Sequence, residues 1–383
     1  MEFTTPFTFE LPTRILYGIG KHKEIPAVLN ALKVRNIEII TDPGITPLPW
    51  FQNLLSLLRR EQFQIGVFDR VESNPKDYNV EDAAQATRTQ KAECILAIGG
   101  GSPIDCAKVA SILAVQGGSL HDYEDRSRIG PNPLPLLAVP TTAGTGSEVT
   151  FGAVITDSVE KYKFTVKSPR IAPCFALLDP ELTLSMPPPL TAATGMDALT
   201  HAIEAYTSRA AEPIADACAL HATRLISSYL RRAVEEGNDL EARSALLLGS
   251  LLAGIAFSHS DVGAVHCIAE ALGGMYDIPH GVCNAVCLPV VMDYCKDGCS
   301  EKYKELGIAM GISQQASSHE ATVAYVHGLA RKVGLPEFRS FSVPPEEFPV
   351  VAQKSVANGS NKNNIPVLTQ KDYVKILYRL IEK

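Results

Sequence analysis

The sequence lacks the features that mark several other classes of protein. No apolar run reaches the roughly 18 uninterrupted residues that a membrane-spanning helix needs. There is no block of Lys or Arg, and the formal net charge is -7, so the chain offers no cationic surface to a nucleic acid or an anionic membrane. The first residues also lack the charged start and long apolar run of a secretory signal. We therefore expect a cytoplasmic protein whose partner is a small molecule.

Cysteine is present, but not in the patterns that disulfides or thiolate metal sites require. The nine cysteines are an odd number, and Cys94 and Cys174 lie within apolar runs, which is typical of reduced, buried thiols. Cys283 and Cys287 are four residues apart, yet no paired CxxC cluster accompanies them. The sequence therefore favours neither a disulfide framework nor a cysteine-bound metal.

The order of apolar patterns predicts two domains. With 383 residues, 46% of them hydrophobic and 20% charged, the chain can bury two cores. In the first half, short runs rich in Ile and Val alternate with amphipathic stretches, which indicates a parallel sheet covered by helices. After the prolines 187–189 the pattern changes to long stretches with a helical period. We expect an α/β domain over residues 1–186 and an all-helical domain over residues 187–383.

A glycine-rich loop follows one of the predicted strands. Gly99, Gly100, Gly101 and Ser102 lie between a buried-type strand and a helix that begins with Pro103, a residue favoured in the first turn. Glycines let the backbone approach a ligand, and the N–H groups at a helix N-terminus bind anions. A pyrophosphate would fit this loop. The alternative interpretation is a tight strand-to-helix turn without a ligand.

Two further segments end predicted strands, where open α/β sheets bind their ligands. Residues 140–148 (PTTAGTGSE) offer small residues and hydroxyl groups after the strand PLLAV. Asp42 closes the strand NIEIITD, where an acidic side chain accepts hydrogen bonds from ribose hydroxyls and repels a 2′-phosphate. This position predicts NAD rather than NADP. The alternative is that Asp42 is a turn residue before Pro43 and Gly44.

Acidic and imidazole side chains lie in the second half of the chain with a spacing suited to a metal ion. Asp197 and His201 are four residues apart in a predicted helix, so their side chains share one face. His266 lies in a second helical stretch, and His280 follows a proline. One carboxylate with imidazoles suits a divalent iron or zinc ion. Each residue alone also suits an ordinary helix surface or core, so spacing makes this set a hypothesis.

Five motifs, taken in order, resemble the iron-containing (group III) alcohol dehydrogenase family and cover nearly the whole chain. They are GGGSPIDCAK (99–108), VPTTAGTGSEVT (139–150), LLDPELT (177–183), TGMDALTHAIEAY (194–206) and VHCIAEALGGMYDIPHGVCNAVCLP (265–289). The resemblance implies the fold shared with dehydroquinate synthase, in which an N-terminal α/β nucleotide-binding domain with a parallel sheet and an all-α metal-binding domain enclose a catalytic cleft. It also implies NAD as cofactor, Fe²⁺ as metal with Zn²⁺ as the alternative, and a homodimer or larger homo-oligomer.

The resemblance assigns roles to individual residues. The implied metal ligands are Asp197, His201, His266 and His280. The implied cofactor site consists of Asp42, Gly99, Gly100, Gly101, Ser102, Asp105, Thr141, Thr142, Ser147 and Lys163.

Two positions differ from what many relatives carry. Relatives often place a further histidine four residues after the third ligand, whereas this chain has Glu270. We interpret Glu270 as a catalytic group that supports the site or handles a proton, with a structural salt bridge as the alternative. His259 lies in the segment that relatives use around the substrate pocket. We expect it to tune specificity there, with helix capping as the alternative.

The resemblance implies reversible, metal-dependent hydride transfer between NAD(H) and a small primary alcohol or aldehyde. Two rivals of the same fold are a zinc enzyme similar to glycerol dehydrogenase and a lyase similar to dehydroquinate synthase. The histidine of the PHG motif and the MDALTHAIE helix argue against both. A catalytically silent nucleotide-binding subunit is the rival of another class, and it is disfavoured because all four candidate ligands are present.

Overall fold

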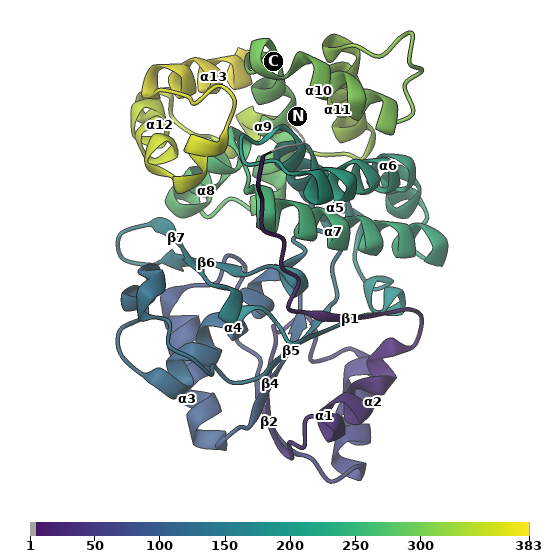
Figure 1. The fold of residues 1–383 in the computed structure, drawn as a ribbon, viewed down its shortest axis with the longest axis vertical. Helices are drawn as coiled ribbons and strands as arrows, with labels where there is room; N and C mark the ends of the chain where they lie inside the picture. The colour runs from purple at the N-terminus through teal and green to yellow at the C-terminus, as the bar shows by residue number, and fades with distance from the viewer. Residues whose placement is uncertain (1–4, 383) are drawn as a thin grey trace.

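The computed structural model describes residues 5–382. They form a sheet half (residues 5–187) and a helical half (residues 188–382). In Figure 1 the parallel sheet lies in the lower part of the molecule and helices α5 to α13 lie in the upper part. The sheet half contains six parallel strands in the order β1-β8-β5-β4-β2-β3. These strands are β1 (Arg14–Tyr17), β2 (Asn36–Ile40), β3 (Gln64–Phe68), β4 (Cys94–Gly99), β5 (Leu136–Pro140) and β8 (Phe175–Leu178). A separate antiparallel hairpin is formed by β6 (Gly152–Asp157) and β7 (Tyr162–Lys167).

Helices cover both faces of the parallel sheet, which explains why its central strands β4 and β5 read as uninterrupted apolar runs. The helices of the sheet half are α1 (Ile25–Ala31), α2 (Pro49–Arg60), α3 (Asp77–Gln90) and α4 (Gly101–Gln116). In β4, Leu96 packs in the core beneath α1 and α2, whereas its neighbour Ile95 packs beneath α3 and α4. Successive side chains of a strand point to opposite faces, so a strand buried on both sides has no polar face.

The helical half packs around one large core. Its helices are α5 (Pro188–Thr207), α6 (Pro213–Glu235), α7 (Leu240–Ser260), α8 (Ala264–Tyr276), α9 (His280–Tyr294), α10 (Lys296–Ala309), α11 (His319–Lys332), α12 (Phe348–Ala357) and α13 (Gln370–Glu382). By length and composition alone α7 resembles a membrane span, but it packs against α5 and α6 within this core. An apolar core helix passes the same test, and this packing identifies α7 as one.

Helix α5 runs through this core, and it carries two of the predicted metal ligands. Almost all of its residues from Thr191 onward are buried, including Asp197 and His201. The close packing depends on Gly195, where a Cβ atom would lie 2.3 Å from Leu230 Cδ1 of α6. Burying carboxylate and imidazole groups is unfavourable unless they have polar partners. The core around α5 must therefore contain a polar site.

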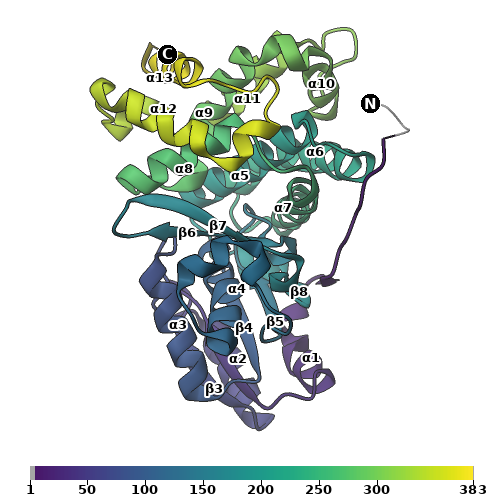
Figure 2. The same ribbon diagram turned by 60° about the vertical axis from the view of Figure 1, so that its left-hand side comes forward.

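The two halves are joined beside a cleft. Figure 2 shows the β6–β7 hairpin between the sheet and α8, and β7 contacts that helix. Lys76 Nζ and Asn74 Nδ2 of the sheet half donate to Asp277 Oδ1 at the end of α8, at 2.8 and 3.0 Å. The predicted fold class is confirmed by this architecture. The boundary between residues 186 and 187 stays a prediction, although strand gives way to helix between β8 and α5.

Candidate active site

A cavity of about 1170 Å³ lies between the two halves and collects most of the predicted site residues. It exceeds the roughly 300–1,000 Å³ that small ligands usually occupy, so a dinucleotide and a second small molecule would fit together. The predicted residues that line it are Asp42, Gly100, Gly101, Ser102, Asp105, Thr142, Ser147, Lys163, Asp197, His201, His266, Glu270 and His280. Those that do not line it are Gly99, Thr141 and His259.

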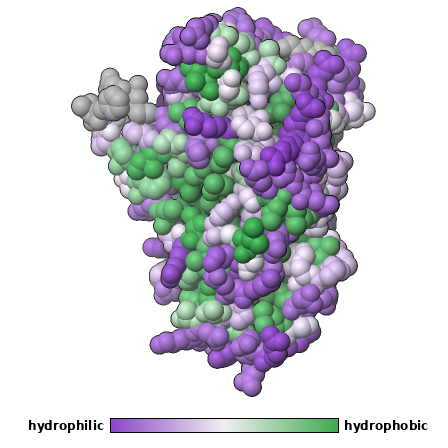
Figure 3. All heavy atoms as spheres, turned by 90° about the vertical axis from the view of Figure 1, so that its right-hand side faces the viewer, coloured by the Kyte–Doolittle hydropathy of each residue, from purple (hydrophilic) through white to green (hydrophobic). Residues whose placement is uncertain are grey.

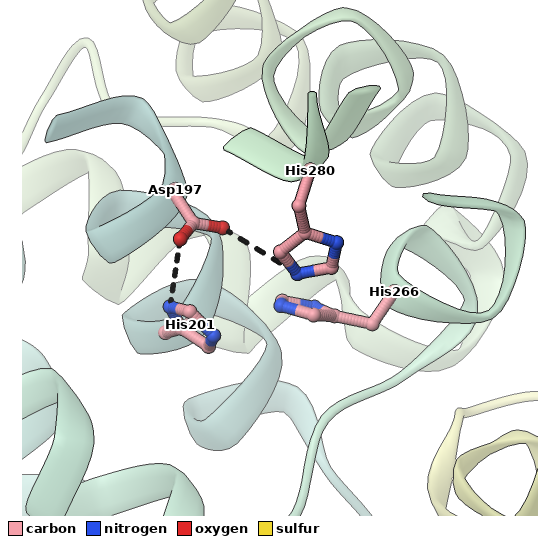
Figure 4. A group of neighbouring side chains, drawn as sticks. All are labelled: Asp197, His201, His266 and His280. Atoms are coloured by element: carbon pink, nitrogen blue, oxygen red, sulfur yellow. Dashed lines mark ion pairs between the residues drawn. The ribbon is translucent and has the colours of Figure 1, made fainter. Parts of the chain in front are cut away.

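Four of these residues converge on one point in the helical half. Figure 4 shows Asp197 and His201 reaching from α5, His266 from α8 and His280 from the first turn of α9. Their ligand atoms all lie within 4.8 Å of one another. Asp197 Oδ2 is 3.9 Å from His201 Nδ1, and Asp197 Oδ1 is 3.9 Å from His280 Nε2. The helical spacing of four therefore places two donors as the sequence predicted, and two other helices complete the cluster.

The chemistry of this cluster fits a divalent metal ion. Burial lowers the pKa of His201 to about 4 and that of His280 well below its usual value, so both rings are neutral at pH 7, the form that binds metals. His201 Nδ1, which faces Asp197, is buried without a hydrogen-bond partner. An unpartnered buried nitrogen carries a penalty that a bound cation removes. A carboxylate with three imidazoles suits iron or zinc.

Asn284 adds a further sign of convergence that the sequence interpretation missed. Its Nδ2 lies 2.7 Å from Asp197 Oδ1, 3.0 Å from His266 Nε2 and 3.1 Å from His280 Nε2. An amide nitrogen has only two protons and cannot serve three acceptors at once. The three atoms therefore surround a single small volume. Asn284 lies one helical turn after His280 on α9, a spacing that could have identified it.

Glu204 is the second residue that the sequence interpretation missed. It lies on the same face of α5 as Asp197 and His201, and its Oε2 is 2.5 Å from His266 Nδ1. Its Oε1 accepts a hydrogen bond from the backbone N–H of Val265 at 2.7 Å. Burial opposes a charge on His266, but the Glu204 carboxylate outweighs that effect and raises its pKa. A carboxylate behind a metal-binding histidine fixes the ring and increases its basicity.

On the opposite side of the cavity the glycine-rich loop leads into α4. Gly100 precedes the first helical residue, so the free N–H groups of this helix face the cavity. Gly99 has a φ of 147°, which favours glycine, and a Cβ atom on Gly101 would lie 2.6 Å from Thr145 Cγ2. Gly99 O accepts a hydrogen bond from Thr141 N at 2.9 Å, which joins the two loops behind the lining. Gly99 and Thr141 therefore shape the site without facing the cavity.

Asp42 is a turn residue whose side chain also lines the cavity, so its position is compatible with both interpretations of the sequence. Its Oδ1 accepts a hydrogen bond from Gly44 N at 2.9 Å, as expected for a turn residue. Its Oδ2 faces the glycine-rich loop, 3.0 Å from where a Cβ atom of Gly99 would lie, and the residue lines the cavity. Burial raises the pKa of the carboxyl group. One oxygen thus holds the turn while the other faces the cavity.

Lys163 of β7 packs against α8, the helix that carries Glu270, since a Cβ atom on Gly273 of that helix would lie 2.9 Å from Lys163 Nζ. Lys163 Nζ donates to Asn74 Oδ1 at 2.8 Å, and burial lowers its pKa. Glu270 Oε2 accepts from Asn358 Nδ2 at 2.5 Å, and burial raises the pKa of this carboxyl group. No ion pair joins them within 4.0 Å among the described residues. Glu270 therefore does not fit a simple salt bridge.

His259 lies outside the cavity, which corrects the expectation that it adjoins the substrate. Its Nδ1 hydrogen-bonds to Ile255 O at 2.8 Å, and its ring stacks on Phe9 with centroids 4.1 Å apart. The ring also contacts the backbone of Glu10. His259 therefore ties the N-terminal segment to the end of α7.

A parallel-sheet half with a glycine-rich loop at a helix N-terminus, facing a carboxylate–imidazole cluster across a cleft, is the arrangement of an enzyme that combines a nucleotide cofactor with a metal ion. The comparisons with known proteins agree with this class. The family model described as iron-containing alcohol dehydrogenase matches residues 12–180, and the C-terminal model of the Fe-containing alcohol dehydrogenase family matches residues 191–381. The chain belongs to the iron-containing alcohol dehydrogenase family, as predicted, and it is an alcohol dehydrogenase.

Individual relatives extend over nearly the whole chain. The chain is 41% identical over 378 residues to 1,3-propanediol dehydrogenase of Citrobacter freundii, covering 97% of each protein. The structure of a 1,3-propanediol oxidoreductase superposes with a TM-score of 0.94 at 37% identity, covering 98% of this chain and 100% of the other. Sulfoacetaldehyde reductase from Bifidobacterium kashiwanohense, solved in complex with NAD+, gives 0.89 at 29% identity, covering 98% and 99%.

Proposed function

We propose that the chain catalyses reversible hydride transfer between NAD(H) and a small primary alcohol or aldehyde, with its metal at Asp197, His201, His266 and His280. The observation that carries this proposal is the convergence of four donor atoms within 4.8 Å on the wall of the shared cavity. We propose Fe²⁺ as the metal, with Zn²⁺ as the alternative, because the donor set suits either ion.

The metal ligands are held rigidly by the chain. Glu204 fixes the ring of His266, and the ring of His201 stacks on Phe257 with centroids 4.3 Å apart. When bound there, a divalent ion supplies Lewis acidity, which lowers the pKa of an alcohol and polarises an aldehyde carbonyl. The protein's part is to orient the alcohol carbon toward the cofactor and to exclude water.

The sheet half supplies the proposed NAD site. The N-terminus of α4 and the glycine-rich loop bind the pyrophosphate, and the free oxygen of Asp42 accepts hydrogen bonds from the adenosine ribose. A carboxylate at this position repels a 2′-phosphate, which favours NAD over NADP. The reductase from Bifidobacterium kashiwanohense, which shares this fold, was solved with NAD+.

Lys163 and Glu270 complete the proposed site where β7 packs against α8. The Lys163 ammonium group, held by Asn74, lies on the sheet side and interacts with the cofactor. Glu270, whose carboxyl group accepts from Asn358, handles the proton that aldehyde reduction consumes. A Glu270→Gln variant with the parent's turnover across pH would contradict this role.

An apolar face supports the proposed homodimer or larger assembly. Figure 3 shows apolar side chains gathered on the face of the molecule along which the N-terminal segment runs. The exposed members of this segment include Phe7, Tyr17 and Ile19, and β1 is an edge strand of the sheet. Exposed edges and apolar patches of this kind mark interfaces between subunits. We place the enzyme in the cytoplasm, where NAD(H) and free thiols are maintained.

A substrate panel tests the proposed function. The protein is loaded with Fe²⁺ or Zn²⁺ and assayed with short alcohols, diols and aldehydes, using NAD(H) and NADP(H) in parallel. We expect turnover of primary alcohols or aldehydes with a clear preference for NAD(H). A metal-loaded protein without turnover on the panel would contradict the proposal, and equal rates with both cofactors would contradict the role of Asp42.

A further inference from the structure

Lys108 is a fully buried cation that neither the metal cluster nor the cofactor contacts described above use. It lies on α4, and its side chain has no exposed surface. Its Nζ donates to Ser147 Oγ at 2.9 Å, Thr150 Oγ1 at 2.7 Å and Gly152 O at 2.8 Å. An ammonium group has three protons, so all of them are used on one segment, residues 147–152.

The charge of Lys108 is balanced by two acidic neighbours. Asp105, one turn earlier on α4, lies 3.8 Å from Nζ, and the buried carboxylate of Glu148 also interacts with it electrostatically. Burial lowers the pKa of Lys108 to about 8, and the two carboxylates act against that shift. A buried charge is retained only where partners surround it, so this lysine has a defined place in the fold.

The hydrogen bonds around Lys108 also define the role of Ser147 and Asp105. The hydroxyl proton of Ser147 goes to Asp105 Oδ1 at 2.5 Å, while its oxygen accepts from Lys108. Asp105 Oδ2 accepts from Val154 N at 2.9 Å. Ser147 therefore has no proton left to donate to a phosphate, and both oxygens of Asp105 are engaged. These two cavity residues act as parts of a scaffold.

The segment that Lys108 holds, together with the glycines just before it, forms one of the contacts between the two halves. Gly146 has a φ of 59°, and a Cβ atom there would lie 2.6 Å from Gly254 Cα of α7. A Cβ atom on Gly144 would lie 2.7 Å from Thr194 Cβ of α5, the helix that carries Asp197. With so little free space, a displacement of this loop changes how α4 and α5 are placed relative to each other.

We propose that Lys108 is a positioning residue: it ties residues 147–152 to α4 and thereby sets the distance between the bound cofactor and the metal ligands on α5. The proposal rests on the proposed NAD site. Lys108 itself touches neither substrate nor cofactor, since it does not line the cavity.

The test compares Lys108→Met with Lys302→Met as a matched control. Methionine keeps the length of the side chain and removes its three donors. Lys302 Nζ donates to Tyr206 O at 2.6 Å in the helical half and does not line the cavity. The measurements are the melting temperature, the Kd for NADH from fluorescence titration, and kcat at saturating cofactor.

We expect Lys108→Met to weaken NADH binding about tenfold and to lower kcat by about 10- to 100-fold, because small misplacements of reacting groups are costly. Lys302→Met should leave both values within about twofold of the parent. If Lys108→Met does not fold, Lys108→Gln keeps two of the three N–H donors on the same buried position, and it should shift both values in the same direction by a smaller factor.

The proposal would be overturned if the variant that folds had the same NADH affinity and the same kcat as the parent, whatever the change in its melting temperature. This outcome differs from a failure of the proposed function. In that case the parent itself would not oxidise alcohols with NAD, whereas the NADH titration would still report on the position of the loop.

Discussion

The two sides of the cavity are lined by different kinds of chemical groups. The sheet side presents backbone amides and small residues at the ends of β4 and β5, where shape depends on glycines such as Gly101. The metal cluster on the helical side consists of one carboxylate and three imidazoles on α5, α8 and α9. The first side is therefore sensitive to an added methyl group, and the second to the loss of a single donor atom. This difference allows the two functions to be disrupted separately.

The largest effect is expected on the helical side. Asp197→Ala removes the carboxylate that lies 3.9 Å from both His201 and His280. Because Lewis acidity contributes several kcal/mol to such reactions, we expect kcat to fall by about 10³-fold together with the loss of bound metal. Elemental analysis and steady-state assays measure both. A variant that keeps its bound metal would refute the assignment of this cluster, and one that loses its metal but keeps its turnover would refute the catalytic role of the metal.

The next largest effect is expected on the sheet side. Gly101→Ala places a methyl group 2.6 Å from Thr145 Cγ2, so the loop must shift at the N-terminus of α4. Overpacking of this kind costs about 1–3 kcal/mol, and we expect NADH affinity to fall by about 100-fold while metal content is unchanged. Gly328→Ala on α11 is the matched control, since a Cβ atom there meets nothing within 4 Å. Equal NADH affinity in the two variants would show that the loop does not bind the cofactor.

A smaller effect is expected from the carboxylate behind the metal cluster. Glu204→Gln keeps an acceptor for Val265 N but removes the charge that supports His266, so we expect metal affinity to fall about tenfold. Competition with a chelator measures this change. The control is Glu212→Gln, because Glu212 is also a buried carboxylate, bound to Ala215 N at 2.6 Å, and does not line the cavity. Comparable loss in both variants would indicate a general effect of buried carboxylates.

The sequence was informative wherever the pattern is local. The spacing of Asp197 and His201 reads directly as one helix face, and the same face continues to Glu204, which could have been identified by its position. The apolar runs of the strands predicted a parallel sheet covered by helices, because burial leaves a direct trace in composition, and the structure shows that both faces are covered.

Long-range pairings left no such trace. The hydrogen bond between Ser147 and Asp105 joins residues 42 positions apart, and the partner of His259 lies 249 positions away in the N-terminal segment. Lys108 follows a cysteine and an alanine within an apolar helix, and only the fold shows that its charge is neutralised inside the protein. The role of a side chain that acts through contacts between distant segments can be identified only from the structure.

The division of labour across the cavity is tested most directly by titrating NADH into the protein before and after its metal is removed with a chelator. The account predicts that the Kd for NADH changes by less than about threefold, because the two sites share no ligand atoms, while alcohol turnover disappears and returns when Fe²⁺ or Zn²⁺ is added. Metal-stripped protein that no longer binds NADH, or that still oxidises alcohols, would contradict it.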